Sequence, residues 1–498
     1  MMPIPRFLIS LLLTLSIFAG PLEALEQRSE PLRIDLARAV RLALEKNFEI
    51  RVDSYSPLLA AARIREARGV FDPEFRFDWE WGAGEPLEFG TGALGVERVI
   101  AAPESRSESI TAGVGGLLAP GTTWDLSTEV LRQETQGPES FQTFAGLRVA
   151  QPLFRGFGSD VNLAPIRIAR IAHAESVWQF RNTVMDVVTR TALIYHDLLF
   201  ARENLEVELR SRSLAQRLLD DNTQRADIGV MSPLDVTGAR AEVAAREEGV
   251  ILARRSVRDN ENFLKQLVTD EVQKILGRPV EPRTVPRLDP PVEDVVVAIG
   301  RALEWRPDYR QALLDLGRRS LNIVVARDGV LPRIDLTASF GVNGLDRSLA
   351  DSIQRTIDQE GPEWTVGAVV RVPIGNRGPR ARRDTAELER AQALVSLKRL
   401  EQDIVVTVDN ALGQIETGRQ RIEATRQARL LARERLDAEE EKLRAGTSTT
   451  FVVLELQKDL ATAEAAELRA LADYNKAVIT FDREIGATLD RHQIVLDL

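Results

Sequence analysis

Two long stretches of the chain follow helical periodicity. Residues 162–227 and 381–445 are rich in Ala, Leu, Arg and Glu, and their apolar residues recur at alternating steps of three and four. A helix of this length extends about 100 Å at 1.5 Å per residue, which is deeper than a globular core. The pattern predicts two long helices that pack against neighbouring helices through narrow apolar stripes.

Shorter segments alternate strictly between apolar and polar residues, as strands with two unlike faces do. In residues 74–81 the apolar positions are all aromatic, namely Phe75, Phe77, Trp79 and Trp81. Residues 333–340 and 364–372 alternate in the same way. The alternation fits either a half-buried soluble sheet or a membrane barrel with lipid outside and water inside.

A lone strand hairpin between such helices has no large sheet to join within its own chain, and an open sheet edge is not stable in lipid. A membrane location therefore predicts that further copies of the chain complete a ring-shaped homo-oligomer. Residues 109–117 and 122–131 are also strand-like, around a turn at Pro120-Gly121. They either extend the hairpins outside the membrane or add strands to the barrel, and the pattern favours neither alternative.

The chain contains the same layout twice. Residues 39–51 resemble residues 298–310 at an offset of 259, which also brings Pro73 onto Pro332. Gly229 and its surroundings resemble Gly446 at an offset of 217. A duplicated unit of helix, strands, long helix, tight turn and helix follows from these matches.

We expect four segments along the chain. They are a signal peptide (1–24), a first repeat (25–276), a Pro-rich linker (277–292) and a second repeat (293–498). The strand regions cover about 73–153 and 332–374, and the tight turns cover 229–232 and 446–449.

The N-terminal residues indicate export. Arg6 precedes a run of apolar residues from Phe7 to Phe18, and small residues follow at Ala19, Gly20 and Ala24. This order is typical of a secretory signal peptide and is too short for a convincing membrane span. The mature chain is expected in the bacterial envelope.

Composition narrows the class further. With 28% charged residues the chain is not a polytopic helical membrane protein, although a β-barrel stays compatible because its strands alternate. The absence of cysteine excludes disulfides, thiol catalysis and thiolate metal sites. A net charge of −10 argues against nucleic acid as the main partner.

We find no catalytic, cofactor-binding or metal-binding constellation and expect no enzyme activity. His196 and Asp197 are neighbours, but adjacent helical side chains point about 100° apart and do not form half a triad. Gly156-Phe157-Gly158 lacks a surrounding βαβ unit and is better explained as a turn between a strand and a helix.

The chain resembles the TolC-like outer-membrane efflux proteins over nearly all of its mature length. The resemblance rests on the duplicated layout and on the strand entries at Ala67 to Pro73 and Ala326 to Pro332. It also rests on the strand exit at residues 151–158 and on the Gly-x-x-Ser/Thr turns that begin at Gly229 and Gly446.

The resemblance implies a homotrimeric channel in the outer membrane of a Gram-negative cell. Each chain would add four strands to a shared 12-stranded β-barrel, continuous with a periplasmic α-helical barrel. Such a channel is the passive exit duct of a tripartite efflux pump or a type I secretion system. A periplasmic adaptor protein and an inner-membrane transporter would open it, and no cofactor is implied.

The two tight turns carry the expected site. Gly229 and Gly446 end long helices, where a left-handed residue is favoured, and Ser232 and Thr449 (or Thr450) suit the N-caps of the following helices. Capping alone accounts for these residues, while the resemblance implies that Gly229, Ser232, Gly446 and Thr449 form the periplasmic tip on which the adaptor docks.

The resemblance also implies acidic residues at a constricted entrance. Asp235 lies six residues after Gly229, but the matching position in the second repeat is Val452, and Glu455 is the nearest acidic residue. A ring of such carboxylates would favour cations and raise their own pKa values by repulsion. Solvated surface carboxylates are the alternative. The four aromatic residues from Phe75 to Trp81 would face lipid.

Two other functions are compatible with parts of the pattern. A periplasmic coiled-coil adaptor or tether without a pore would use the long helices but leaves the aromatic alternation unexplained. An exported helical enzyme would need a polar constellation that the sequence does not show. The transported cargo is not encoded in any motif of the chain.

Overall fold

The computed structural model describes residues 31–85, 87–91, 97–101, 105–134, 138–283 and 294–496. The expected signal peptide and most of the expected linker lie outside these residues. Unit 1 consists of the chain up to Asn47, Arg190–Leu288 and Arg421–Asn475. Unit 2 consists of Phe48–Thr189, Asp289–Gln420 and Lys476–Leu498.

Unit 1 is built from helices and a small parallel strand pair. Its elements are β1 (Leu32–Ile34), α1 (Leu36–Lys46), the later part of α5 (Ala164–Asp227), α6 (Pro233–Val268), α7 (Val272–Ile275), β8 (Val280–Pro282), the end of α11 (Arg377–Arg444) and most of α12 (Thr450–Glu484). Tyr195 is fully buried in the core, where its hydroxyl donates to Ile34 O (3.2 Å) and accepts from Arg283 N (3.1 Å). These bonds attach β1 and the end of β8 to α5.

A charged cluster is buried in the same unit. Lys265 is 1% exposed, donates from Nζ to Leu276 O (3.0 Å) and lies 3.7 Å from the Glu261 carboxylate. Arg202 contacts Glu261 at 2.8 Å. Burial lowers the pKa of Lys265, against the opposing effect of Glu261. The cluster joins α5 to α6.

Unit 2 contains helices from both halves of the sequence. They are α2 (Phe48–Asp53), α3 (Tyr55–Arg68), a 3-10 turn (Gly69–Phe71), α4 (Ser159–Asn162), the start of α5, α8 (Val295–Trp305), α9 (Pro307–Asp328), α10 (Leu349–Ile357), the start of α11, the end of α12 and α13 (Thr488–Arg491). No helix among the described residues is both long and apolar enough to cross a membrane.

The repeat seen in the sequence is visible at helix ends. α1 and α8 begin and end at positions 259 apart, and their N-caps Asp35 and Asp294 each accept a backbone N–H with the side chain. The strands β2 (Glu74–Gly84) and β9 (Arg333–Asp346) begin at the same offset. The two halves therefore use the same local signals to start equivalent elements.

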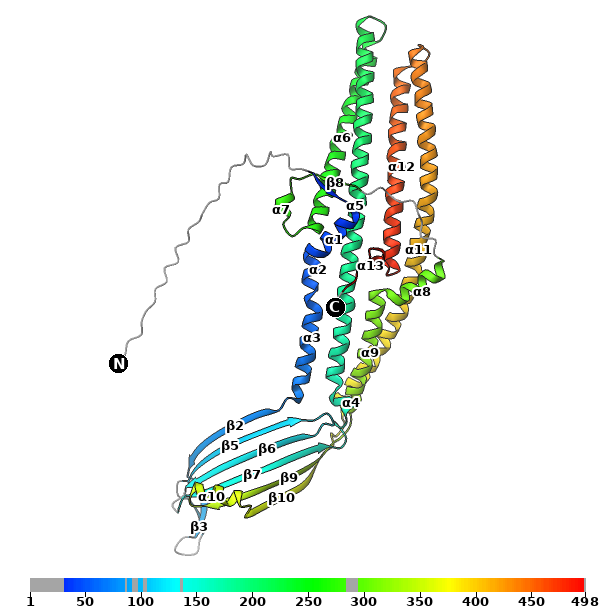
Figure 1. Cartoon of the computed structure of the whole chain (residues 1–498). Coiled ribbons are helices and arrows are strands. Elements are labelled where there is room, and N and C mark those ends of the chain that lie inside the picture. The colour runs from blue at the N-terminus through cyan, green and yellow to red at the C-terminus, as the bar shows by residue number, and fades with distance from the viewer. Residues whose placement is uncertain are drawn as a thin grey trace, which may run out of the picture. The chain divides into compact units, whose positions relative to one another are not determined.

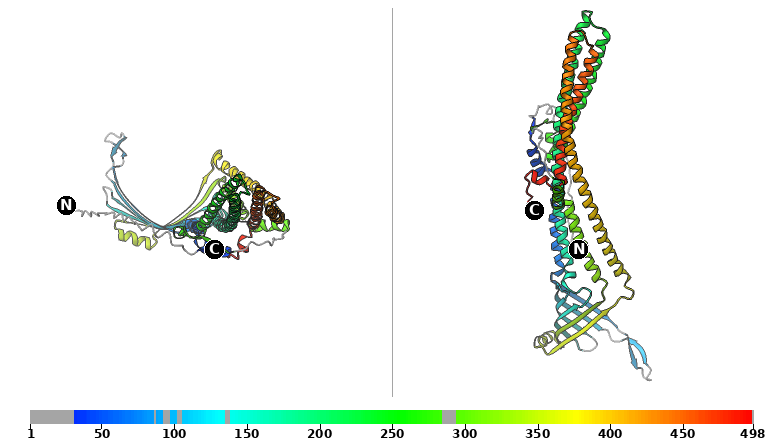
Figure 2. Two further views of the ribbon diagram at one scale, coloured as in Figure 1. Left: turned by 90° about the horizontal axis from the view of Figure 1, so that it is seen from above. Right: turned by 90° about the vertical axis from the view of Figure 1, so that its right-hand side faces the viewer.

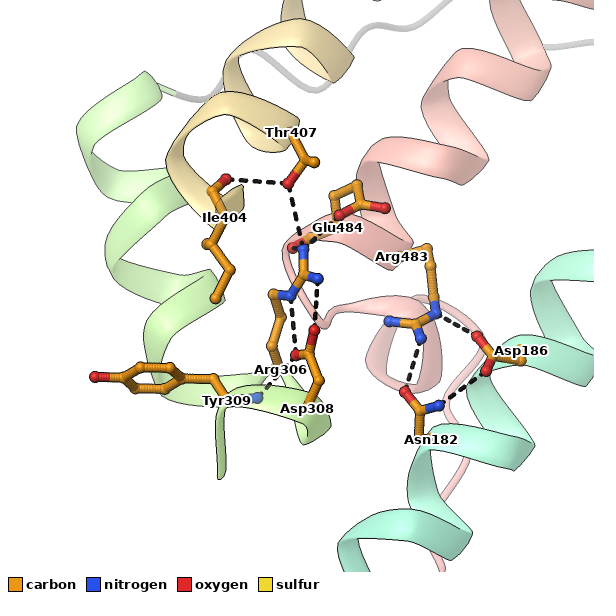
Figure 3. A network of polar contacts seen from close by, with 9 residues as sticks. All are labelled: Asn182, Asp186, Arg306, Asp308, Tyr309, Ile404, Thr407, Arg483 and Glu484. Carbon is orange, nitrogen blue, oxygen red and sulfur yellow. Dashed lines mark hydrogen bonds and ion pairs between the residues drawn. The ribbon is translucent and has the colours of Figure 1, made fainter. Parts of the chain in front are cut away.

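A polar network holds α9, α11 and the end of α12 together (Figure 3). The Arg306 guanidinium donates to the Asp308 carboxylate at 2.7 Å and to the backbone carbonyl of Glu484 at 3.3 Å. It also pairs with the Glu484 carboxylate. Burial would raise the pKa of Asp308, but the hydrogen bonds and charge of Arg306 outweigh it and lower that pKa. Nearby, Arg483 bonds Asp186 at 2.7 Å.

The sheet of unit 2 has six strands in the order β10-β9-β7-β6-β5-β2, and all neighbours are antiparallel (Figure 1). The remaining members are β5 (Ser105–Leu117), β6 (Thr123–Glu134), β7 (Ser140–Pro152) and β10 (Gly361–Arg371). β3 (Leu87–Thr91) and β4 (Glu97–Ala101) pair separately.

Because this sheet has six strands, the expectation of four strands per chain in a shared 12-stranded barrel is not confirmed. The strand-like residues that the sequence left without an assignment form β5 and β6, and these strands lie between β2 and β7. Their register is continuous with both neighbours over most of their length. Residues 109–117 and 122–131 thus pair within the sheet, and the choice between barrel strands and hairpins that extend outside the membrane stays a prediction.

Candidate functional site

The first tight turn joins α5, which ends at Asp227, to α6, which begins at Pro233. Gly229 has φ +79°, in the left-handed region that favours glycine. Val230 N bonds Arg225 O at 2.9 Å, and Gly229 N bonds Ala226 O at 2.9 Å. These bonds close a Schellman-type end, as the sequence predicted for this glycine.

The second turn repeats the first at an offset of 217. α11 ends at Arg444 and α12 begins at Thr450, and Gly446 also has φ +79°. Thr447 N bonds Lys442 O at 2.9 Å, in the same bond pattern as the first turn. The two turns are thus equivalent in backbone conformation.

The N-caps differ between the turns. Ser232 accepts Leu234 N with its hydroxyl at 3.2 Å, as expected. Thr449 precedes α12 and accepts Val453 N with its backbone carbonyl at 3.4 Å. Thr450 already lies in α12, and its hydroxyl donates to Asn222 Oδ1 on α5 at 3.3 Å. Thr450 therefore links the two helical hairpins.

The two hairpins pack against each other near the turns. An apolar cluster there consists of Leu218, Leu436, Val453, Leu456 and Leu460. Asn222, which receives the Thr450 hydroxyl, is also buried. The turns of one chain are consequently held in a fixed relation inside unit 1.

Large apolar side chains are exposed at both turns. Ile228 and Leu234 are 75% and 77% exposed, and Val230 and Phe451 are exposed as well. Exposed apolar residues grouped in this way are typical of a surface that binds another protein. These four residues were not predicted from the sequence, although apolar residues beside a turn glycine are a signal that can be read there.

The expected acidic residues lie near these turns. Asp235 is exposed in the first turn of α6, where its backbone N–H bonds Ser232 O at 3.0 Å. Glu455 is exposed on α12 and lies 3.8 Å from the Lys458 ammonium. The neighbouring lysine reduces the negative charge that Glu455 can present, and the role of both residues at an entrance stays a prediction.

The six-stranded sheet has two unlike faces. Phe75, Phe77, Trp79 and Trp81 are all exposed on one face of β2. The register continues this apolar face across the sheet through Ile110, Val130, Leu147, Phe340 and Trp364.

The opposite face is polar. A hollow of about 600 Å³ on this face is lined by residues of all six strands, including Arg76, Asp125, Arg148 and Ser339. The amphipathic pattern that the sequence showed for single segments thus extends over the whole sheet.

Helix α10 identifies the outer side of the curved sheet. It bonds β7 through Ser352 O, which accepts the Thr143 hydroxyl at 2.9 Å, so it covers the apolar face at one end. Seen from above, α10 lies on the convex side (Figure 2). The apolar face is therefore convex and the polar face concave, as in a barrel with lipid outside.

His196 is a packed residue of the helical core. His196 is buried and its ring meets the Tyr195 ring edge-on at 6.0 Å between centroids. Within the described ranges, no three His, Cys, Asp or Glu side chains are grouped in a way that could hold a metal ion.

Comparison with known proteins agrees with the geometry. A profile of the family described as outer membrane efflux protein matches residues 120–269 and 298–487, more than half of the chain. The chain belongs to this family. The sequence resemblance to TolC-like outer-membrane efflux proteins is thereby confirmed.

Relatives of the family show the extent of the match. The outer membrane protein TolC of Vibrio cholerae is 23% identical over 398 residues, covering 80% of this chain and 88% of its own. The pyoverdine export outer membrane protein OpmQ of Pseudomonas putida is 26% identical over 302 residues, covering 59% of this chain and 60% of its own.

Solved structures show the same fold. The Campylobacter jejuni CmeC outer membrane channel has a TM-score of 0.67 at 16% identity and covers 91% of this chain and 86% of its own. The outer-membrane channel OprN has a TM-score of 0.68 at 17% identity, with 91% and 90% covered. The protein is an outer membrane efflux protein, which overturns the alternative of a periplasmic coiled-coil tether.

Proposed function

We propose that three copies of the chain form the channel. Each copy would add its curved sheet to one closed β-barrel and its long helices to a periplasmic tube. The edge strands β2 and β10 support this arrangement, because in the described sheet each pairs with a neighbouring strand on one side only. Such edges need partners in lipid, and further copies of the chain can supply them.

The convex face would contact lipid and the concave face would line the channel. Phe75, Phe77, Trp79 and Trp81 lie on the convex face beside an unpaired edge. The polar hollow lies on the other side. This two-faced curved sheet is the single observation that carries the proposed channel.

The exposed apolar turns would bind a periplasmic adaptor protein, which joins the channel to an inner-membrane transporter. Gly229, Ser232, Gly446 and Thr449 shape the two turns, and the apolar side chains beside them supply the contact area. Val230 is exposed, and it closes the turn through its backbone N–H, which bonds Arg225 O, rather than through its side chain.

Substitution of Val230 tests the docking surface. Val230→Asp is expected to abolish export in cells while the trimer still forms, because a charge replaces apolar contact area. Val230→Ile is the matched control and should export normally. Full export by Val230→Asp would contradict docking at this turn.

Asp235 and Glu455 would form the acidic ring at the periplasmic entrance. Asp235→Asn is expected to reduce the cation preference of single channels in a planar bilayer. Glu455→Gln should have the smaller effect, because Lys458 already pairs with Glu455. Unchanged selectivity in the double variant would contradict the ring.

Membrane fractionation tests the assembly. The full chain is expected in the outer membrane as a trimer that dissociates into single chains only on heating in detergent. A single-chain species at all temperatures, or recovery in the soluble periplasmic fraction, would contradict the proposal.

A further inference from the structure

The inserted hairpin β5–β6 occupies the centre of the sheet rather than its edge. It pairs with β2 on one side and with β7 on the other, and both pairings are antiparallel. Its strands have 13 and 12 residues, enough for a tilted strand to cross the hydrocarbon region. The hairpin thus has the position and length of a membrane-spanning pair.

The two-faced pattern runs through the insertion without a break. On the convex face, Ile110 of β5 lies between Trp79 and Val130. On the concave face, Thr111 lies between Asp78 and Glu129. An extracellular hairpin surrounded by water would not need an apolar face that continues those of its neighbours.

An ion pair on the concave face ties the insertion to β2. Arg76 of β2 contacts Asp125 of β6 across the intervening strand β5. The contact passes over Gly115, where a Cβ atom would lie 3.0 Å from Asp125 Oδ2 and 3.5 Å from Arg76 Nη2. Glycine at this position leaves room for a bond between strands that are not neighbours.

The inner turn of the insertion is anchored at the start of the helices. Gly121 has φ +94°, and a Cβ atom on it would lie 2.1 Å from Gly156 O. Gly158 N also bonds Pro120 O at 3.0 Å. The turn therefore packs tightly against the segment that leads from β7 into α4, so the insertion reaches the same end of the sheet as its neighbours.

An even number of strands keeps ring closure compatible with antiparallel pairing. Because all five pairings in the sheet are antiparallel, the edge strands β2 and β10 run in opposite directions. β2 of one copy can then pair antiparallel with β10 of the next. Two added strands preserve this relation, whereas one would not.

We propose that each chain contributes six strands to the barrel, so that a closed ring of three copies has eighteen strands and a lumen wide enough for bulky polar solutes. The inference rests on the proposed trimeric channel and adds the strand count and the width. Because barrel diameter grows roughly linearly with strand number, the barrel is about 1.5 times as wide as one of twelve strands.

A shortened variant provides the matched comparison. Replacement of residues 85–139 by Asn-Gly joins β2 directly to β7 as a tight hairpin. Gly84 would then oppose Ser140, and Phe77 would oppose Leu147, which keeps the apolar residues of both strands on one face. Electron cryomicroscopy of both proteins in lipid nanodiscs counts the strands. Eighteen in the full chain and twelve in the variant are expected.

Labelling measures the width independently. The chain has no cysteine, so Arg148→Cys on the concave face places one thiol per chain in the lumen. Maleimide-linked polymers of increasing size, added from outside, should react up to a limiting diameter. This limit is expected to fall to about two thirds in the shortened variant.

The outcomes separate the inference from the proposed function. A trimer of the full chain with twelve membrane strands and residues 105–134 outside the barrel would overturn the inference and leave the channel intact. Absence of any trimer would instead contradict the proposed function. If the shortened variant does not fold, the strand count of the full chain still decides.

Discussion

The Arg306 network provides a quantitative test of how unit 2 is held together. In Arg306→Met the volume of the side chain is largely kept, but Asp308 and Glu484 lose their cation. Removal of one partner of a buried ion pair costs about 3–5 kcal/mol. The side chains of Asp308 and Glu484 are 38% and 24% exposed, so water offsets part of this loss. We therefore expect Arg306→Met to lower the local stability by about 2–3 kcal/mol.

Hydrogen exchange followed by mass spectrometry measures this loss locally. For the full chain in nanodiscs, peptides from α9 should exchange about 30- to 150-fold faster in Arg306→Met than in the parent protein, since each 1.4 kcal/mol is a factor of ten. The control is Arg327→Gln, which removes a pair with Glu387 whose side chains are 66% and 42% exposed. That change should cost less than about 1 kcal/mol. Equal exchange in the two variants would refute the reasoning.

Three further predictions concern packing and protonation. Gly486→Ala should lower the free energy of unfolding by about 1–3 kcal/mol, because Gly486 has φ +76° and a Cβ atom on it would lie 2.8 Å from Trp305 C. A lower thermal midpoint is expected, and an unchanged midpoint would contradict this reasoning. Because the pKa of Asp308 is lowered in the folded protein, its ionised carboxylate stabilises the fold above the unfolded pKa of about 3.9, and this stabilisation is lost as the pH falls further. Asp308→Asn should therefore flatten the acid side of a plot of unfolding free energy against pH. Because the pKa of Lys265 is lowered in the folded protein, the free energy of unfolding should rise with pH toward about 10. Lys265→Met should remove that rise and cost little near neutral pH, because Glu261 still pairs with Arg202. A loss above about 3 kcal/mol would show that the lysine is required.

Local signals predicted the helices and their ends well. α5 was expected over residues 162–227 and is observed over Ala164–Asp227. Its end was readable because a glycine follows at the position where left-handed backbone closes a helix. The same reasoning placed the end of α11 within one residue, since Gly446 repeats the signal.

Pairing between distant segments could not be read from the same signals. β5 contains Gly113, Gly115 and Gly116, which weaken its alternation, and periodicity does not say which strand lies beside it. The order of the six strands in the sheet was not predicted for this reason. The contact between Arg306 and Glu484 joins residues 178 positions apart and has no local signature.

The conformation of the two turns was predicted in part, and their role as a docking site stays a prediction. The glycines and Ser232 occupy the turns as expected, because capping depends on residues close together in sequence. The exposed Ile228, Leu234 and Phe451 were missed, since exposure depends on what the folded chain leaves uncovered.

The orientation of the sheet in the membrane can be measured with spin labels. Single cysteines at Phe77 and Phe340 on the convex face, and at Asp78 and Ser339 on the concave face, would each carry a nitroxide in the reconstituted protein. The convex positions should be relaxed by oxygen, which partitions into lipid, and the concave positions by a water-soluble nickel chelate. Equal access of the nickel chelate to all four positions would contradict an outer-membrane channel built from this sheet.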